Sequence, residues 1–112
     1  MSITAKAIIP AKQAENVQTT QYTAASSTRT IIDKFTATNT SAGSVTLSVN
    51  LVTSGDTAGN QNLITKTKSL AAAEVYTFPE IVGHVLNPGD FISTIAGAAT
   101  SITIRACGRE IN

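Results

Sequence analysis

The clearest pattern in the chain is a strict alternation of apolar and polar residues over residues 44–51. The apolar positions are Val45, Leu47, Val49 and Leu51, and the residues between them are Thr46, Ser48 and Asn50. Side chains of a strand point alternately to the two faces of a sheet. The spacing therefore predicts a strand that buries one face in the core and leaves the other in water.

A second strand is predicted over residues 29–40. Its apolar face would carry Ile31, Phe35 and Ala37, and threonines fill the opposite face. Asp33 interrupts the apolar face, so the start of this strand is less regular than its end. Residues 39–43 contain Asn, Ser and Gly, which is the composition of a turn and predicts a hairpin between the two strands.

Further short strands are predicted over residues 63–69, 75–78, 91–95 and 101–108. Polar or Gly- and Pro-containing turns separate them, most clearly at residues 53–60 and 86–90. In the last strand Ile102, Ile104 and Ala106 would face inward, and Thr103, Arg105 and Cys107 outward. Short strands at intervals of about eight to twelve residues are typical of sandwiches and barrels. With no helical period anywhere, the sequence predicts a single small all-β domain, a β-sandwich with a jelly-roll-like layout.

Residues 1–28 are expected to differ from the rest and to form an extended N-terminal arm with a loosely attached first strand. Ile3, Ile8 and Ile9 give weak strand content, but residues 13–27 are almost entirely Gln, Asn, Thr, Ala and Ser. Such a segment buries little surface to offset the entropy lost when it becomes ordered. The sandwich proper would then cover residues 29–112, with the arm resting on it or lying along a neighbouring subunit.

Charge and hydropathy narrow the classes of function. Charged residues make up 13% of the chain, the net charge is +1, and eight Lys and Arg are interspersed with seven acids. We therefore expect no binding of nucleic acid or anionic membrane, although Lys66 and Lys68 would share a strand face. A near-neutral surface suits self-association.

No apolar stretch approaches the ~20 residues of a membrane span, and residues 1–10 lack a signal-peptide layout, so synthesis in the cytoplasm is expected.

Few residues could support catalysis. His84 is the only histidine and Cys107 the only cysteine, so neither a conventional zinc site nor an internal disulfide is expected. Asp56 and Asp90 fit turn positions. We therefore expect no enzymatic activity, no cofactor, no metal and no small-molecule substrate. A carbohydrate-binding module is a further class, although the chain has no Trp for a sugar-stacking platform.

Several segments define the overall layout of the chain: residues 31–41, the alternating strand 45–51, the Gly- and Asp-containing loop, residues 69–74 (Ser-Leu-Ala-Ala-Ala-Glu), the turn 86–90 (Leu-Asn-Pro-Gly-Asp) and the closing strand 102–108. Together they resemble the small jelly-roll or β-sandwich virion proteins of tailed bacteriophages. The resemblance covers roughly residues 29–108 and consists of layout and composition. The Pro-Gly-Asp turn also occurs in cupins, but a cupin metal site needs several histidines.

The resemblance implies a capsid decoration (cement) protein, which binds the outer shell between capsomers and stabilises it through many repeated contacts. Its partners would be the major capsid protein and copies of itself, as a dimer or trimer, and it would be found in the virion. The expected contact residues are Ile3, Ile8 and Ile9 in the arm, with Tyr22 as an anchor. A tail or head–tail connector protein and a carbohydrate-binding module remain as alternatives.

Overall fold

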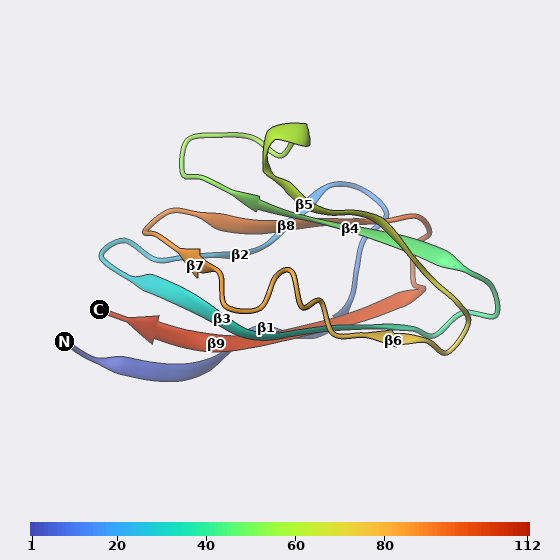
Figure 1. Ribbon diagram of the computed structural model, residues 1–112, viewed down its shortest axis with the longest axis horizontal. Coiled ribbons are helices and arrows are strands. Elements are labelled where there is room, and N and C mark those ends of the chain that lie inside the picture. The colour runs from blue at the N-terminus through green and yellow to red at the C-terminus, as the bar shows by residue number, and fades with distance from the viewer.

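The structure, a computed structural model, describes residues 1–112 and consists of two antiparallel sheets packed face to face (Figure 1). Sheet A contains, in spatial order, β1 (Ile3–Gln13), β9 (Ile102–Ile111) and β3 (Arg29–Asn39), and the short strands β6 (Val75–Tyr76) and β7 (Val85–Leu86) both pair with β3. Sheet B has the order β2 (Thr19–Thr23), β8 (Phe91–Ala96), β4 (Val45–Val52) and β5 (Leu63–Leu70). The helical element is the single turn η1 (Asn60–Asn62).

Strands that are distant in the sequence lie side by side in both sheets. β1 pairs with β9 and β2 pairs with β8, so the first two strands are joined to the last two. The chain passes from one sheet to the other at most connections (Figure 1). This strand order is that of a jelly roll, and the predicted all-β sandwich is confirmed.

The core between the sheets is closed by a segment that is not a strand. Phe78 and Ile81, in the connection between β6 and β7, are completely buried. The Phe78 ring packs edge-on against Phe35 of β3, with ring centroids 4.8 Å apart. The Gly83 N–H donates a hydrogen bond to the Ile32 carbonyl, which fixes the segment along β3. Since an aromatic ring buries a large apolar area, this connection supplies core volume that the two-residue strands beside it lack.

A β-bulge in β3 changes which isoleucine enters the core. The register with β9 shifts between residues 32 and 34, which leaves Asp33 as the extra residue. Ile32 is therefore buried, and Ile31, the residue expected in the core, pairs with Arg109 on the outer face. Opposite the bulge, a Cβ atom on Gly108 would collide with the Ile31 carbonyl oxygen, so the close approach requires glycine. The other inward predictions for these two strands are confirmed: Phe35, Ala37, Ile102, Ile104 and Ala106.

The expected N-terminal arm is not present, because residues 1–28 contribute a strand to each sheet. β1 pairs with β9 over residues 3–13, and Ile8 and Ile9 lie in the core. The polar stretch that follows is ordered by its side chains. Gln18 and Gln21 each donate a hydrogen bond to a hydroxyl group of β8, at 2.7 and 3.0 Å. Hydrogen bonds of this kind, which composition does not reveal, replace the apolar burial that the segment lacks.

Tyr22 of β2 connects the two sheets near the chain termini. Its hydroxyl lies 2.7 Å from Thr30 Oγ1 and donates a hydrogen bond to Glu110 Oε2 at 2.6 Å, and both partners belong to sheet A. Lys6 Nζ lies 3.5 Å from the same Glu110 oxygen. Burial raises the pKa of Tyr22 to about 12, and the Glu110 carboxylate adds to the rise, because both disfavour the charged phenolate.

Two isoleucines of β1 provide a matched test of its place in the sheet. Ile9 is 1% exposed, whereas Ile3 is 59% exposed. We expect Ile9→Ala to lower the free energy of unfolding by ~2–5 kcal/mol, because it removes core contacts and leaves a cavity. Ile3→Ala is expected to change it by less than ~0.5 kcal/mol. Urea unfolding followed by circular dichroism measures both variants, and equally small effects would show that β1 behaves as a dispensable arm.

The contact between Tyr22 and Glu110 is expected to contribute to stability in a pH-dependent way. Tyr22→Phe should lower the free energy of unfolding at neutral pH by ~1–3 kcal/mol, because the partly buried Glu110 carboxylate loses a hydrogen-bond donor. The wild-type free energy of unfolding should fall as pH rises from 10.0, the ordinary pKa of tyrosine, through about 12, since Tyr22 ionises first in the unfolded chain.

Urea titrations at a series of alkaline pH values measure this dependence. Tyr22→Phe should show a smaller loss of stability over that interval than the wild type. Tyr76→Phe is the comparison variant. It removes the other phenol with a raised pKa, which is bonded to Glu80, and leaves the larger Tyr22 contribution in place, so its loss of stability should exceed that of Tyr22→Phe. An identical pH dependence in the wild type and in Tyr22→Phe would contradict the assignment.

Candidate assembly interface

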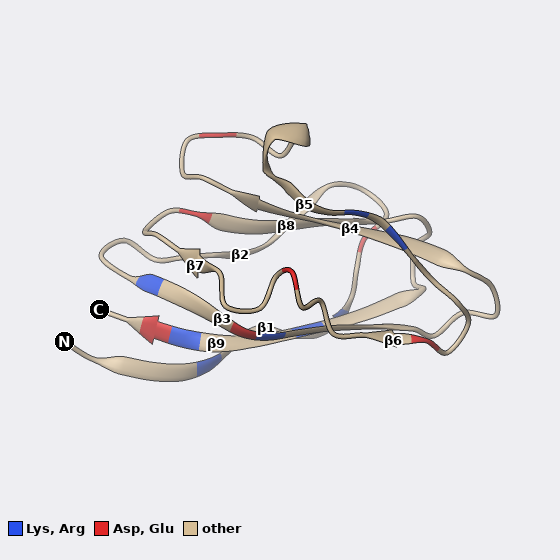
Figure 2. Cartoon of the chain, viewed as in Figure 1, with Lys and Arg blue, Asp and Glu red and all other residues tan.

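No loop folds over the outer face of sheet A (Figure 1). Its strands β3 and β9 carry several Lys and Arg residues (Figure 2). Four of the eight Lys and Arg residues of the chain point outward here: Arg29 and Lys34 from β3, and Arg105 and Arg109 from β9. The acid on this face is Asp33, at the bulge. Four positive charges against one negative give the face a net charge of +3, and since the whole chain carries +1, the rest of the molecule carries −2.

One of these four cations has a carboxylate partner. Arg109 donates from Nε and Nη2 to the two oxygens of Asp33, each at 3.0 Å. The hydrogen bonds and the charge of Asp33 raise the pKa of Arg109, although an exposed pair of this kind adds little to stability. The other two salt bridges of the chain involve lysines of β1. The remaining three cations of the face are therefore unpaired.

A shallow hollow of about 240 Å³ lies on this face between β3 and β9. It is lined by Lys34, Thr36, Arg105 and Cys107. Lys34 pairs with Cys107 and Thr36 pairs with Arg105, so the two cations are diagonal neighbours across the strands. Like charges at this spacing repel each other. The hollow is thus a place where two cationic side chains converge without an acid from the chain itself.

The four contact residues expected from the sequence do not form one surface. Ile8 and Ile9 are buried in the core and are not available to a partner in this structure. Tyr22 is half-buried and joins the sheets. Ile3 is exposed and pairs with Ile111 on the outer face of sheet A, so it alone lies beside the cationic surface.

The sequence contains only part of the signal for the cationic face. Alternation in the last strand correctly places Arg105 on the outside. Arg109 lies four residues later in the same strand and therefore faces the same side. Lys34 could not be placed in the same way, because the bulge at Asp33 reverses the alternation of β3. Its approach to Arg105 also depends on the pairing of two strands that are far apart in the sequence.

The outer face of sheet B is covered around Asn50 of β4, contrary to the expectation that the polar face of this strand lies in water. Asn50 is 2% exposed. Its Nδ2 donates to the Gly59 carbonyl at 3.1 Å and to Asn62 Oδ1 at 2.8 Å, and its Oδ1 accepts from Gln18 at 3.3 Å. A buried polar group is stable only with such partners, so these bonds hold the 53–62 loop on the sheet.

A register shift in β5 separates the two lysines expected to share a strand face. Lys66 lines a shallow groove on the outer face of sheet B. Lys68 Nζ lies 4.7 Å from the centre of the Tyr76 ring, on the side of the core. Thr67, between them, has a positive φ of 44°. It lies where β5 has one residue more than the paired stretch of β4. The bulge therefore reverses the alternation at this point.

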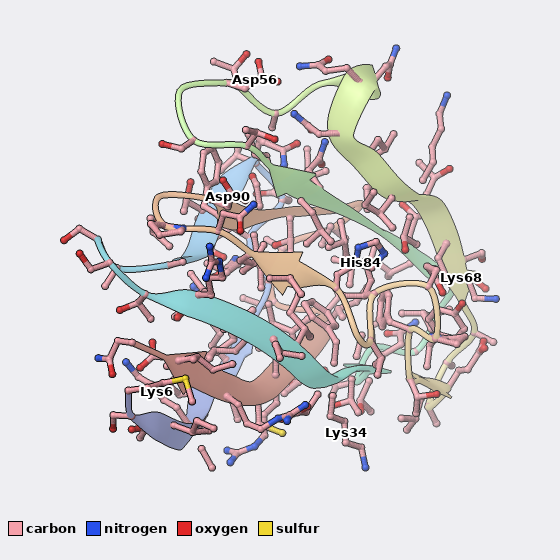
Figure 3. The ribbon with its side chains drawn as sticks, turned by 60° about the vertical axis from the view of Figure 1, so that its left-hand side comes forward. Lys6, Lys34, Asp56, Lys68, His84 and Asp90 are labelled. Atoms are coloured by element: carbon pink, nitrogen blue, oxygen red, sulfur yellow. The ribbon has the colours of Figure 1, made fainter.

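The side chains with metal-binding or nucleophilic chemistry are dispersed. His84 is exposed (Figure 3). It lines a shallow groove together with Leu51, Ile64 and Val85. Cys107 is half-buried and free. The structure contains no group of three or more His, Cys, Asp and Glu side chains arranged to hold a metal ion. None of its helical residues belongs to a segment long and apolar enough to span a bilayer.

Comparison with known proteins identifies a fold and assigns no family. No family model matches the chain, and no curated protein is similar to it in sequence. Among solved structures it is similar to a protein of Bacillus endospore appendages, which are described as disulfide-linked pili. The TM-score is 0.56 and the identity 15%, over 99% of this chain and 88% of that chain. It is also similar to a chain of infectious bursal disease virus, Gx strain, with a TM-score of 0.55 and 13% identity, over 97% of this chain but 32% of that chain. Likeness at this level of identity shows a shared β-sandwich fold.

Proposed function

We propose that this protein is a structural subunit of a larger particle, and specifically a capsid decoration protein that binds the outer shell between capsomers. The observation that carries the proposal is that nearly the whole chain forms one jelly-roll sandwich, similar in fold to a pilus protein and to a chain of a virus. A small sandwich with a broad uncovered face is suited to bind a flat surface. Outer shells offer many equivalent surfaces of that kind.

The faces of the sandwich are better suited to such contacts than its edges. β1, at one edge of sheet A, contains Pro10, two register shifts, Lys6 and Lys12. β5, at one edge of sheet B, has two register shifts and carries Lys66. Proline, bulges and lysine prevent a sheet edge from pairing with another chain. Strand addition is thereby disfavoured, and face-on contact through sheet A is favoured.

Repetition supplies the strength of attachment in this proposal. Each copy makes a modest contact, and the symmetry of the particle multiplies that contact through a high effective concentration. The partners are then the major capsid protein and neighbouring copies of this chain, arranged as a dimer or trimer. The protein resides in the virion.

A filament subunit is the second candidate, and the extent of structural similarity favours it. The pilus protein is matched over 88% of its chain, compared with 32% for the virus chain. The molecule is elongated, with extents of 46 × 26 × 20 Å. A filament requires contact between two different surfaces of the same subunit, repeated without closure.

Copy number in purified particles tests the proposal. Quantitative mass spectrometry should find this protein and the major capsid protein in a molar ratio within a few-fold of one. A handful of copies per particle would indicate a neck or tail component. If the protein is recovered with fibres and not with particles, the filament subunit is favoured. If the protein is absent from both fractions, the structural role is overturned.

A further inference from the structure

The outer face of sheet A carries charge that the chain itself does not neutralise. Its net charge is +3, and Arg29, Lys34 and Arg105 lack salt-bridge partners. Lys34 extends from the sheet into solvent on the side of the molecule opposite Asp56 (Figure 3). Like charges on neighbouring strands repel, so an anionic partner on this face would relieve an unfavourable arrangement.

The hollow gives this charge a defined geometry. Lys34 and Arg105 approach it from diagonal positions on β3 and β9, and Thr36 lies in the same lining. Lysine and arginine form short, charge-assisted hydrogen bonds with carboxylates, whereas the Thr36 hydroxyl already donates to the Arg105 carbonyl at 3.4 Å. A carboxylate side chain that entered the hollow would therefore meet donors from both strands.

The other side chains of the face favour a protein partner over a nucleic acid. Ile3 pairs with Ile111, and Ile31 pairs with Arg109, so aliphatic and cationic residues are interleaved. Apolar contacts combined with complementary charge are typical of protein interfaces. The five aromatic residues belong to the core, to sheet B or to the inward side of β6, so the face has no platform on which bases could stack.

We propose that the outer face of sheet A docks onto an acidic protein surface, with a partner carboxylate held in the hollow between Lys34 and Arg105. This inference rests on the proposed role as an assembly subunit, and it names the face and the chemistry of the surface that the face meets. Docking supplies the missing counter-charge and covers the exposed side chain of Ile3.

Titration of the full chain with an oligoglutamate peptide tests the inference. Backbone amide shifts in the NMR spectrum should change along β3 and β9 and not in sheet B. Because Cys107 is the only cysteine and lies in the lining of the hollow, its alkylation by the neutral reagent iodoacetamide should slow when the peptide binds. Both effects should disappear in about 1 M salt, where exposed charges are screened.

Charge-reversal variants assign the effect to the hollow. Lys34→Glu combined with Arg105→Glu should weaken peptide binding about tenfold or more. Lys12→Glu, a charge reversal on the exposed edge of β1, is the control and should weaken it no more than about twofold. An oligolysine peptide should bind the double variant better than the wild type, and a wild-type circular dichroism spectrum shows that the variant is folded.

Several outcomes would overturn the inference. Shifts confined to other strands, undetectable binding by the wild type, or undiminished binding by the double variant would each do so. Tighter binding of single-stranded DNA of equal charge would assign the face to nucleic acid, and salt-sensitive self-association lost in the double variant would assign it to a second copy of the chain.

Particle incorporation separates this inference from the proposed function. If the double variant enters particles at the wild-type copy number, the docking face is wrong and the decoration role stands. If the wild type is absent from particles but binds the acidic peptide through β3 and β9, the docking chemistry stands and the decoration role is wrong.

Discussion

The pairing of β3 with β9 is the constraint on which the rest of the structure depends. β9 lies between β1 and β3, so its register determines the orientation of both neighbours. Gly108 lets the β3 backbone approach closely at the bulge, and Asp33 takes up the extra position. The bulge turns Ile32 into the core and Lys34 into solvent. One local irregularity therefore sets both the packing of the sandwich and the charge pattern of its outer face.

Hydrogen bonds between polar side chains order segments that have little apolar surface. Tyr22 joins the two sheets through Glu110, and Asn50 holds the 53–62 loop. No buried side-chain nitrogen or oxygen lacks a partner. Complete pairing matters because an unpartnered buried polar group costs about 1–3 kcal/mol. A chain rich in Thr, Ser and Asn can thus form a well-defined sandwich with few large hydrophobic residues.

Hydrophobic alternation was sufficient to predict the all-β sandwich and the inward residues of the last strand. In a regular strand, successive side chains alternate between the two faces, so the apolar positions identify the face that is buried. It failed wherever a bulge reverses that period, as at Asp33 and Thr67. Composition failed for residues 1–28, since partners for Gln18 and Gln21 come from β8, which lies far along the chain. The cationic face depends on the same long-range pairings and so could be predicted only in part.

The central place of the last strands has a consequence for how the domain is made. β8 and β9 occupy interior positions in their sheets, and of the nine strands of this domain they are synthesised last. Until they emerge, β1 and β2 have no neighbours to pair with. Neither sheet can close during synthesis, so the chain stays open until translation of this region is finished. Such distant pairings also make folding slow compared with that of helical domains of the same size.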